Sequence, residues 1–425
     1  MTRMKESGID WIGQIPEEWE VAKVNHIFEE HKQKNRGNKE KNLLSLSYGR
    51  IIRKSIDSSF GLLPESFDTY NIIQRGDIVL RLTDLQNDKR SLRVGLAREN
   101  GIITSAYLTL RLKNLESNDS YMYYLLHTYD ICKVFYNFGG GVRQGGTWSD
   151  IYKMELLIPP CNEQQKIADF LDKKTAQLDK IKALLGEQIQ KLKDYRSSLI
   201  YEIVTKGLDK TVPMKDSGID WIGQVPEGWG VIKFKYLGDV KQGLTYSPSD
   251  IVDKDEGILV LRSGNIQNGI LDFTNNVYVK TKVAESIVLR KNDILITARN
   301  GSPVLIGKNA IIDTDIKATF GAFMMVFRAN QSLFAKFAFY LMNVSFNFYR
   351  TFFTTSTVNQ LTAAIFNGIE VPLPSIYEQK KITDFLDEKT VQIDKLIQIK
   401  SQQINNINKQ RQTLIYDYVT GKRRV

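Results

Sequence analysis

The sequence predicts a fold of the α/β class: two globular α/β domains related by a pseudo-twofold internal repeat and separated by two long antiparallel coiled-coil helices. Three observations predict this fold. Long segments recur in both halves of the chain, proline-marked boundaries stand at matching places, and leucine or isoleucine recurs every seventh residue after each boundary. A repeat on this scale indicates the architecture, because each copy is expected to fold as one structural unit.

The repeat is carried by three pairs of segments. Residues 4–21 (MKESGIDWIGQIPEEWEV) recur as residues 214–231 (MKDSGIDWIGQVPEGWGV), at an offset of 210. The segment EQQKIADFLDKKTAQLDK from Glu163 recurs as EQKKITDFLDEKTVQIDK from Glu378, at an offset of 215. A third pair, RSSLIYEIVTKG and RQTLIYDYVTGK, shares that second offset. Identity this dense indicates duplication rather than shared composition.

Each half follows one plan: an opening motif, a variable stretch, a boundary rich in proline and a long helix. The variable stretches differ in sequence but share strand-like runs entered through an aspartate, RGDIVLRLT and KNDILITAR, which begin at Arg75 and Lys291. The predicted parts are residues 1–161 (opening motif and first globular domain), 162–207 (central helix), 208–375 (second motif and globular domain) and 376–425 (C-terminal helix). Two domains that share a strand pattern but differ in their loops suggest that both perform the same function on two different targets.

The apolar spacing of seven predicts a coiled-coil seam along both helices. Ile181, Tyr195 and Leu396 are among the residues expected to fill intervening seam positions. Neither helix can bury its seam alone, so the two are expected to pack together, antiparallel, with the N-terminal motif near the end of the C-terminal helix. The predicted interface residues are Leu171, Leu178, Leu185, Leu192, Leu199, Leu386, Ile393, Ile407 and Leu414.

Composition favours an acidic partner. The chain has 425 residues, a formal net charge of +10 and a sequence pI near 9.2, and nucleic acid is the commonest partner of basic proteins; a soluble protein that is merely basic is the alternative. Two cysteines and three histidines lack metal-ligand spacing and a disulfide framework, which fits a cytoplasmic location. The apolar stretch from Phe334 to Phe353 contains Lys336 and Arg350, so we expect a buried helix rather than a membrane span.

Motifs for catalysis are not evident in the sequence. A methyltransferase is expected to carry Asn or Asp before Pro-Pro and an aromatic residue after it, but Pro159–Pro160 stands between Ile158 and Cys161. Asp77 and Asp293 each open an apolar strand, so a turn role is favoured over catalysis. We therefore expect a recognition protein that is not an enzyme.

The motifs around GIDWIGQIPEEW and PPCNEQQKIADFLD, both present twice, resemble those of the specificity subunits of Type I restriction–modification enzymes. The resemblance covers essentially the whole chain. It implies two target recognition domains, each reading one half of a split site in double-stranded DNA, with the paired helices setting the separation. It also implies docking of two modification (methyltransferase) subunits, which would use S-adenosylmethionine, and of restriction subunits that form the nuclease and translocase. No cofactor is expected on this chain.

Base reading requires polar and basic side chains on loops that can reach groove edges. Polar segments at matched places in the two variable domains supply candidates, although a solvated surface loop is the alternative for the glycine-rich segment from Phe138 to Trp148. The predicted DNA contacts are Tyr48, Arg50, Arg53, Lys89, Arg90, Arg93, Arg143, Gln144, Thr147, Arg262, Ser263, Asn265, Gln267, Arg299, Asn300, Thr357, Asn359 and Gln360.

Two other classes of protein compete with this interpretation. One is a coiled-coil scaffold with two protein-binding domains, which the unlike polar loops in matched domains disfavour. The other is a self-contained enzyme whose site forms only on folding, which the lack of a clustered His, Cys or acidic constellation in the sequence disfavours. A DNA gel shift with partner subunits present separates these classes.

Overall fold

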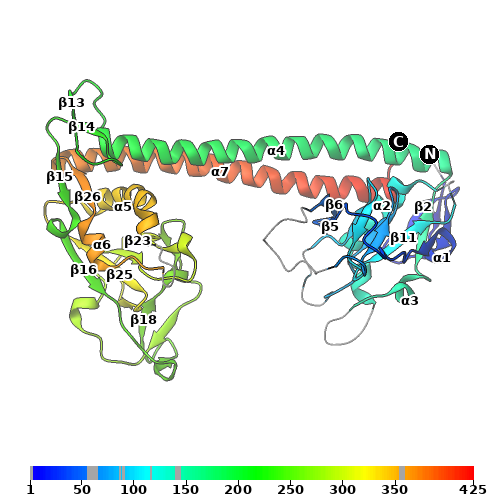
Figure 1. Ribbon diagram of the computed structural model, residues 1–425, viewed down its shortest axis with the longest axis horizontal. Helices are drawn as coiled ribbons and strands as arrows, with labels where there is room; N and C mark the ends of the chain where they lie inside the picture. Colours follow the sequence, from blue (N-terminus) through cyan, green and yellow to red (C-terminus); the bar gives the residue numbers. More distant parts are fainter. Residues whose placement is uncertain are drawn as a thin grey trace. The chain divides into compact units, whose positions relative to one another are not determined.

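The computed structural model describes residues 3–54, 66–85, 88, 91–114, 117–138, 145–353 and 359–425. The chain divides into two compact units, residues 1–186 with 400–425 (unit 1) and residues 187–399 (unit 2). Each unit combines small β-sheets with helices and contains part of two long helices, α4 (Cys161–Lys206) and α7 (Ile376–Val419). The predicted α/β class and the pair of long helices are confirmed (Figure 1).

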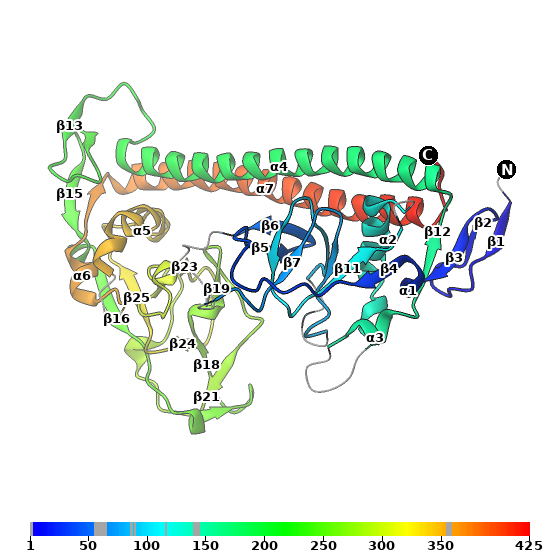
Figure 2. The same ribbon diagram turned by 45° about the vertical axis from the view of Figure 1, so that its right-hand side comes forward.

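Unit 1 is organised around a four-stranded antiparallel sheet in the order β4-β11-β8-β9. Helix α2 packs against β9 and, on its other side, lies close to the long helices (Figure 2). Apart from the long helices, its elements are β1 (Met4–Glu6), β2 (Gln14–Pro16), β3 (Glu20–Lys23), α1 (Val24–Ile27), β4 (Phe28–Glu30), β5 (Leu44–Ser47), β6 (Arg50–Arg53), β7 (Asn71–Ile73), β8 (Ile78–Leu80), β9 (Val94–Leu96), β10 (Gly101–Ile103), β11 (Leu108–Leu112), α2 (Asp119–Ile131), α3 (Trp148–Ile151) and β12 (Glu155–Ile158).

Unit 2 repeats the sheet as β16-β25-β22-β23, again antiparallel, and adds a mixed sheet in the order β17-β21-β18-β24. The two antiparallel sheets have matching strand orders, which is the structural form of the sequence repeat. Its elements are β13 (Met214–Asp216), β14 (Gln224–Pro226), β15 (Gly230–Lys233), β16 (Gly238–Gln242), β17 (Ile251–Val252), β18 (Ile258–Leu261), β19 (Ile266–Gln267), β20 (Ile270–Leu271), β21 (Val277–Val279), β22 (Ile294–Thr297), β23 (Asn309–Ile311), β24 (Ala318–Phe320), β25 (Met324–Ala329), α5 (Ala335–Tyr349), α6 (Ala363–Gly368) and β26 (Glu370–Leu373).

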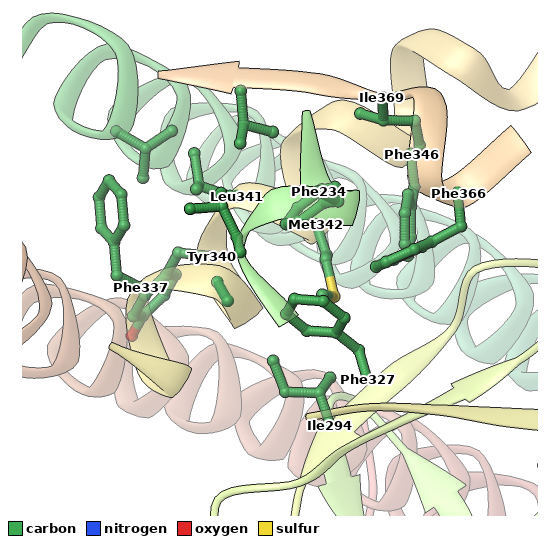
Figure 3. Packing of buried hydrophobic residues seen from close by; sticks show 14 of the residues in the cluster. Phe234, Ile294, Phe327, Phe337, Tyr340, Leu341, Met342, Phe346, Phe366 and Ile369 are labelled. Atoms are coloured by element: carbon green, nitrogen blue, oxygen red, sulfur yellow. The ribbon is translucent and has the colours of Figure 1, made fainter. Parts of the chain in front are cut away.

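The core of unit 2 is aromatic. Figure 3 shows Phe234, Phe327 and Phe366 pointing toward one another between the sheet and the helices. The rings of Phe234 and Phe366 stack with centroids 4.8 Å apart, and those of Phe327 and Phe366 are 5.2 Å apart. The stretch predicted as a buried helix is α5, which contributes Phe337 and Leu341 to this core. None of the helices that the structure describes is long and apolar enough to cross a membrane.

The long helices begin and end where local chemistry favours it. Prolines precede both, and each is followed within two residues by a glycine in the left-handed region, Gly207 with φ 73° and Gly421 with φ 71°, where other residues are strained. In unit 1, Phe170 contacts Tyr418 and Lys182 bonds to Asn408, so the two helices run antiparallel there. The predicted contact of the N-terminal motif with the end of α7 is also confirmed, because Lys422 donates to the carbonyls of Ile12 and Gln14 at 2.9 and 2.7 Å.

Burial along the long helices follows the predicted heptad positions, but three residues predicted to lie between those positions are exposed. Ile181, Tyr195 and Leu396 are exposed, at 46%, 57% and 46%. Counted from Leu171 in α4 and from Leu386 in α7, the positions that face the seam recur after four and then three residues. Each of the three exposed residues stands one residue before such a position. Of the predicted interface residues, Leu171, Leu386 and Ile393 are buried, and Leu178, Leu185, Leu192, Leu199, Ile407 and Leu414 are half-buried.

Candidate nucleic-acid interface

In unit 2 the structure brings predicted contact residues from separate segments to one cleft of about 840 Å³. Arg262 and Ser263 follow β18, and Arg299 and Asn300 follow β22. Strand β18 belongs to the mixed sheet and β22 to the antiparallel sheet. The two strands end at the same cleft, so the residues that follow them come together there. The segment 242–247 also reaches the cleft through Leu244, Thr245 and Tyr246.

Arg299 is held in place by two neighbours. Its Nη2 donates to Oε1 of Gln360 at 2.7 Å, and its guanidinium carbon lies 5.8 Å from the centre of the Phe323 ring. Leu361 donates its backbone N–H to Ala298 at 2.8 Å, which fixes the segment of Gln360 beside the end of β22. A guanidinium held this way loses less conformational entropy when it binds a planar acceptor pair, such as the edge of a guanine.

Phe323 was not among the predicted contacts. It is 61% exposed in the turn between β24 and β25 and lines the cleft. The sequence from Phe320 to Met325 contains mostly apolar residues and is easily taken for one continuous strand. The signal that could have found it is Gly321, which allows a turn directly before an aromatic residue.

Two predicted contacts are wrong because their side chains are buried. Arg93 is fully buried, and its guanidinium donates to backbone carbonyls, among them those of Thr83 at 2.7 Å and of Asp88. Asn265 is 1% exposed and holds its own turn by accepting from the backbone N–H of Arg262 at 2.9 Å. Both side chains stabilise loops and are not available to bases in this structure.

The remaining unit 2 candidates keep local roles that leave them accessible. Gln267 is exposed and donates to the carbonyl of Gly264 at 3.1 Å. Asn359 donates to the carbonyl of Gly301 at 3.3 Å, which ties its segment to the loop after β22. Asn300 accepts from the backbone N–H of Ser302 at 3.0 Å.

In unit 1, three of the predicted DNA contacts lie on or next to the β5–β6 hairpin. Tyr48 is 82% exposed at the tip of the β5–β6 hairpin, where it and Gly49 both have positive φ, as a tight turn of this kind requires. Arg50 forms an ion pair with Asp179 of α4, and Arg53 bonds to Glu99 at 2.7 Å. The hydrogen bonds from Arg53 hold the pKa of Glu99 below its usual range.

The segment before α3 occupies the same place in unit 1 as the segment of Gln360 in unit 2. Gly146 donates its backbone N–H to Leu82, after β8, at 2.7 Å. Thr147 is exposed and caps α3, with its hydroxyl 2.7 Å from Oδ2 of Asp150. Lys89, Arg90, Arg143, Gln144 and Thr357 lie outside the described residues.

The aspartates that open β8 and β22 have the turn role expected from the sequence. Asp77 accepts the backbone N–H of Gln74 at 2.7 Å, and Asp293 that of Arg290 at 2.8 Å. Among the described residues, no group of three or more His, Cys, Asp or Glu side chains is arranged to hold a metal ion.

Two units that repeat one sheet order, each carrying its own set of polar loops, define a duplicated recognition protein. Comparison with known proteins identifies its family. The model described as the Type I restriction modification DNA specificity domain matches residues 16–191 and again residues 226–409. The chain belongs to this family and carries the domain twice; it is a specificity subunit, the non-catalytic component of its class.

Individual relatives agree with the family. The chain is 32% identical over 206 residues to the EcoKI specificity subunit of Escherichia coli (strain K12), in an alignment that covers 47% of this chain but only 44% of that protein. It is 24% identical over 426 residues to the MjaVIII specificity subunit of Methanocaldococcus jannaschii, which covers 97% of this chain and 94% of that one.

Solved structures show the same fold at low identity. A chain from a structural study of the assembly and conformational transition of a type I R-M system superposes with a TM-score of 0.71 and 15% identity, covering 95% of this chain and 98% of that chain. The HsdS subunit from Thermoanaerobacter tengcongensis superposes with a TM-score of 0.50 and 15% identity, covering 96% and 98%.

Proposed function

We propose that this chain reads a bipartite sequence in double-stranded DNA for a Type I restriction–modification complex, with one recognition domain for each half-site. The observation that carries the proposal is the cleft of unit 2, where Arg262, Arg299 and Asn300 arrive from two strands and Gln360 holds Arg299. Arginine and asparagine are the side chains that most often read guanine and adenine through paired hydrogen bonds.

The internal repeat indicates which part of the chain performs which role. Residues 1–161 and 208–375 supply the two recognition domains with their opening motifs, and residues 162–207 and 376–425 supply the helices that set the spacing of the half-sites. Two readers carried by one chain also gain affinity, because the second contact becomes intramolecular once the first is made. Unlike loops on a shared frame explain how the two half-sites differ.

The partners proposed for this chain are DNA, two modification subunits and the restriction subunits, in the cytoplasm. The solved relative described for complex assembly of a type I R-M system supports this proposal. The modification subunits would bind S-adenosylmethionine, and the specificity subunit would bind no cofactor. Recognition domains with little excess positive charge would then be sufficient for the complex to bind DNA, because the partner subunits also contact the DNA backbone.

Methylome sequencing tests the proposal. A host that carries this chain with its cognate modification subunit is expected to gain a methylated motif in two parts, and the motif should vanish when this chain is omitted. If the complex assembles in pull-down experiments but no new methylation appears, the proposal fails and the scaffold alternative gains support.

A further inference from the structure

Unit 1 contains a cavity of its own where the β5–β6 hairpin, α2 and the two long helices meet. Its volume is about 810 Å³, and its lining includes Tyr123, His127, Lys182 and Arg411. The hairpin adds Arg50 at the rim. Two of the predicted DNA contacts, Tyr48 and Arg50, line this cavity, but the proposed function assigns no role to His127 or Arg411.

The cavity contains buried polar groups without partners. His127 is 2% exposed, and neither of its ring nitrogens has a hydrogen-bond partner among the described residues. The Nε of Arg411 is also buried and lacks a hydrogen bond within the described part of the chain. Buried polar groups in native proteins are nearly always satisfied, and those left unpaired are often ligand sites.

The internal repeat provides a built-in comparison for Arg411. Its counterpart in unit 2, at an offset of 215, is Arg196, whose Nε lies 3.2 Å from Oδ1 of Asp394. The counterpart of Asp394 in unit 1 is Asp179, but Asp179 is paired with Arg50 of the hairpin instead. Arg411 therefore lacks the carboxylate that balances the same arginine in the other unit.

The counterpart of His127 in unit 2 is also hydrogen-bonded, whereas His127 itself is not within the described part of the chain. At an offset of 216 unit 2 has Asn343, an amide that is satisfied by donating to the carbonyl of Phe339 at 2.9 Å. The lining of the unit 1 cavity carries three cations, Arg50, Lys182 and Arg411, against one carboxylate. The Nε of Arg196 also lacks a hydrogen bond among the described residues, so the two units differ in charge rather than at this atom. Unit 1 thus has a surplus of positive charge and an unpaired imidazole at a place where unit 2 has an ion-paired arginine and a hydrogen-bonded amide.

We propose that this cavity binds a phosphate group, with Arg411 and His127 as its principal ligands and Lys182 at its edge. A tetrahedral oxyanion accepts several N–H donors at once and supplies the missing negative charge. The cavity volume exceeds that of a bare phosphate, so the group can belong to a free small molecule or to the backbone of bound DNA. The inference does not depend on which bases the cleft of unit 2 recognises.

The test observes the cavity directly through its histidine. The full-length chain contains three histidines, so labelling their ring Cε1 with ¹³C gives a small set of signals, and His127→Asn assigns the one of interest. Titration with inorganic phosphate at constant ionic strength should shift the His127 signal saturably, with a Kd below about 1 mM. A second titration, with a short DNA duplex, shows whether the bound phosphate group comes from DNA or from a small molecule. If the duplex shifts the His127 signal and added phosphate reverses that shift, the group is a backbone phosphate. If only inorganic phosphate shifts the signal, the ligand is a small molecule.

Matched variants separate the site from general charge. Arg411→Met should weaken phosphate binding at least tenfold, whereas Arg196→Met, at the equivalent place in unit 2, should leave it unchanged. Lys182→Met, at an exposed position, should weaken it several-fold and serves if Arg411→Met does not fold. The proposal is overturned if neither phosphate nor duplex shifts the His127 signal, or if Arg196→Met weakens binding as much as the unit 1 variants.

Discussion

Arg328 closes a bidentate ion pair on Asp293, with its Nε and Nη2 each 2.7 Å from one carboxylate oxygen. Arg111 makes the same pair with Asp77 in unit 1, at 2.8 and 2.7 Å. Both aspartates are buried, at 1% and 2% exposure. Each pair therefore ties β25 or β11 to the turn that opens the neighbouring strand, and each compensates a buried carboxylate.

Removing one partner of the pair should be costly. Arg328→Leu leaves Asp293 buried without its countercharge and is expected to lower the free energy of unfolding by about 3–5 kcal/mol. Urea denaturation of the full chain, followed by a probe in unit 2, measures this loss. Arg290→Leu is the control, because Arg290 is exposed and its substitution should cost no more than about 0.5 kcal/mol. Equal losses in the two variants would show that the pair does not stabilise the turn.

The phase of the helical seam predicts a contrast between two leucines of α7. Leu386 is fully buried and Leu396 is 46% exposed. Leu386→Ala should therefore destabilise unit 2 by about 2–5 kcal/mol through lost contacts and a cavity. Leu396→Ala should change stability by no more than about 0.5 kcal/mol. Thermal and urea unfolding of both variants check the contrast, and a large loss for Leu396→Ala would place the seam one residue earlier.

His127 should make unit 1 sensitive to acid. Burial, followed by the charge of Arg411, lowers the pKa of His127 from 6.5 to about 3. Tyr123 and the cations Arg50 and Lys182 also line this cavity, with Asp179 as its only carboxylate among the described lining residues. The unfolded chain binds this proton more readily, so the contribution is fully present above pH 6.5 and is lost as pH falls toward 3.

The corresponding experiment compares stability at two pH values in phosphate-free buffer. The free-energy difference between wild type and His127→Asn should shift by about 2 kcal/mol between pH 7.5 and pH 5, with wild type losing more on acidification. His26→Asn, which alters an exposed histidine, should follow the wild-type profile. Parallel pH profiles for wild type and His127→Asn would contradict the burial of a neutral imidazole.

The fold was largely predictable from the sequence because the repeat is long and the helices carry regular spacing. The helix bounds, the glycine ends and the turn role of Asp77 all follow from local signals. The three errors in the seam arose because apolar residues stand directly before seam positions. Spacing of leucine alone cannot choose between adjacent residues when both are apolar, as with Leu396 next to Ile397.

The candidate site was less predictable because contacts distant in sequence decide which polar residues are free. Arg93 has the composition of a DNA contact but is fully buried against loop carbonyls, and no local signal indicates this. The pairing of Asp293 with Arg328 spans 35 residues. Only the fold places Arg299 beside Gln360, 61 residues later, and the ring of Phe323 beside Arg299.

The central claim is that each domain reads its own half of a split site, and Arg299 offers the most direct test. Methylomes are compared in hosts carrying wild type, Arg299→Lys or Arg299→Ala with the modification subunit. Wild type should give a two-part motif, and the variants should relax one or more positions in one half while the other half stays unchanged. A lost bidentate contact corresponds to about 1–3 kcal/mol of discrimination at one base. A continuous motif in wild type, or a change in both halves from Arg299→Lys, would contradict the account.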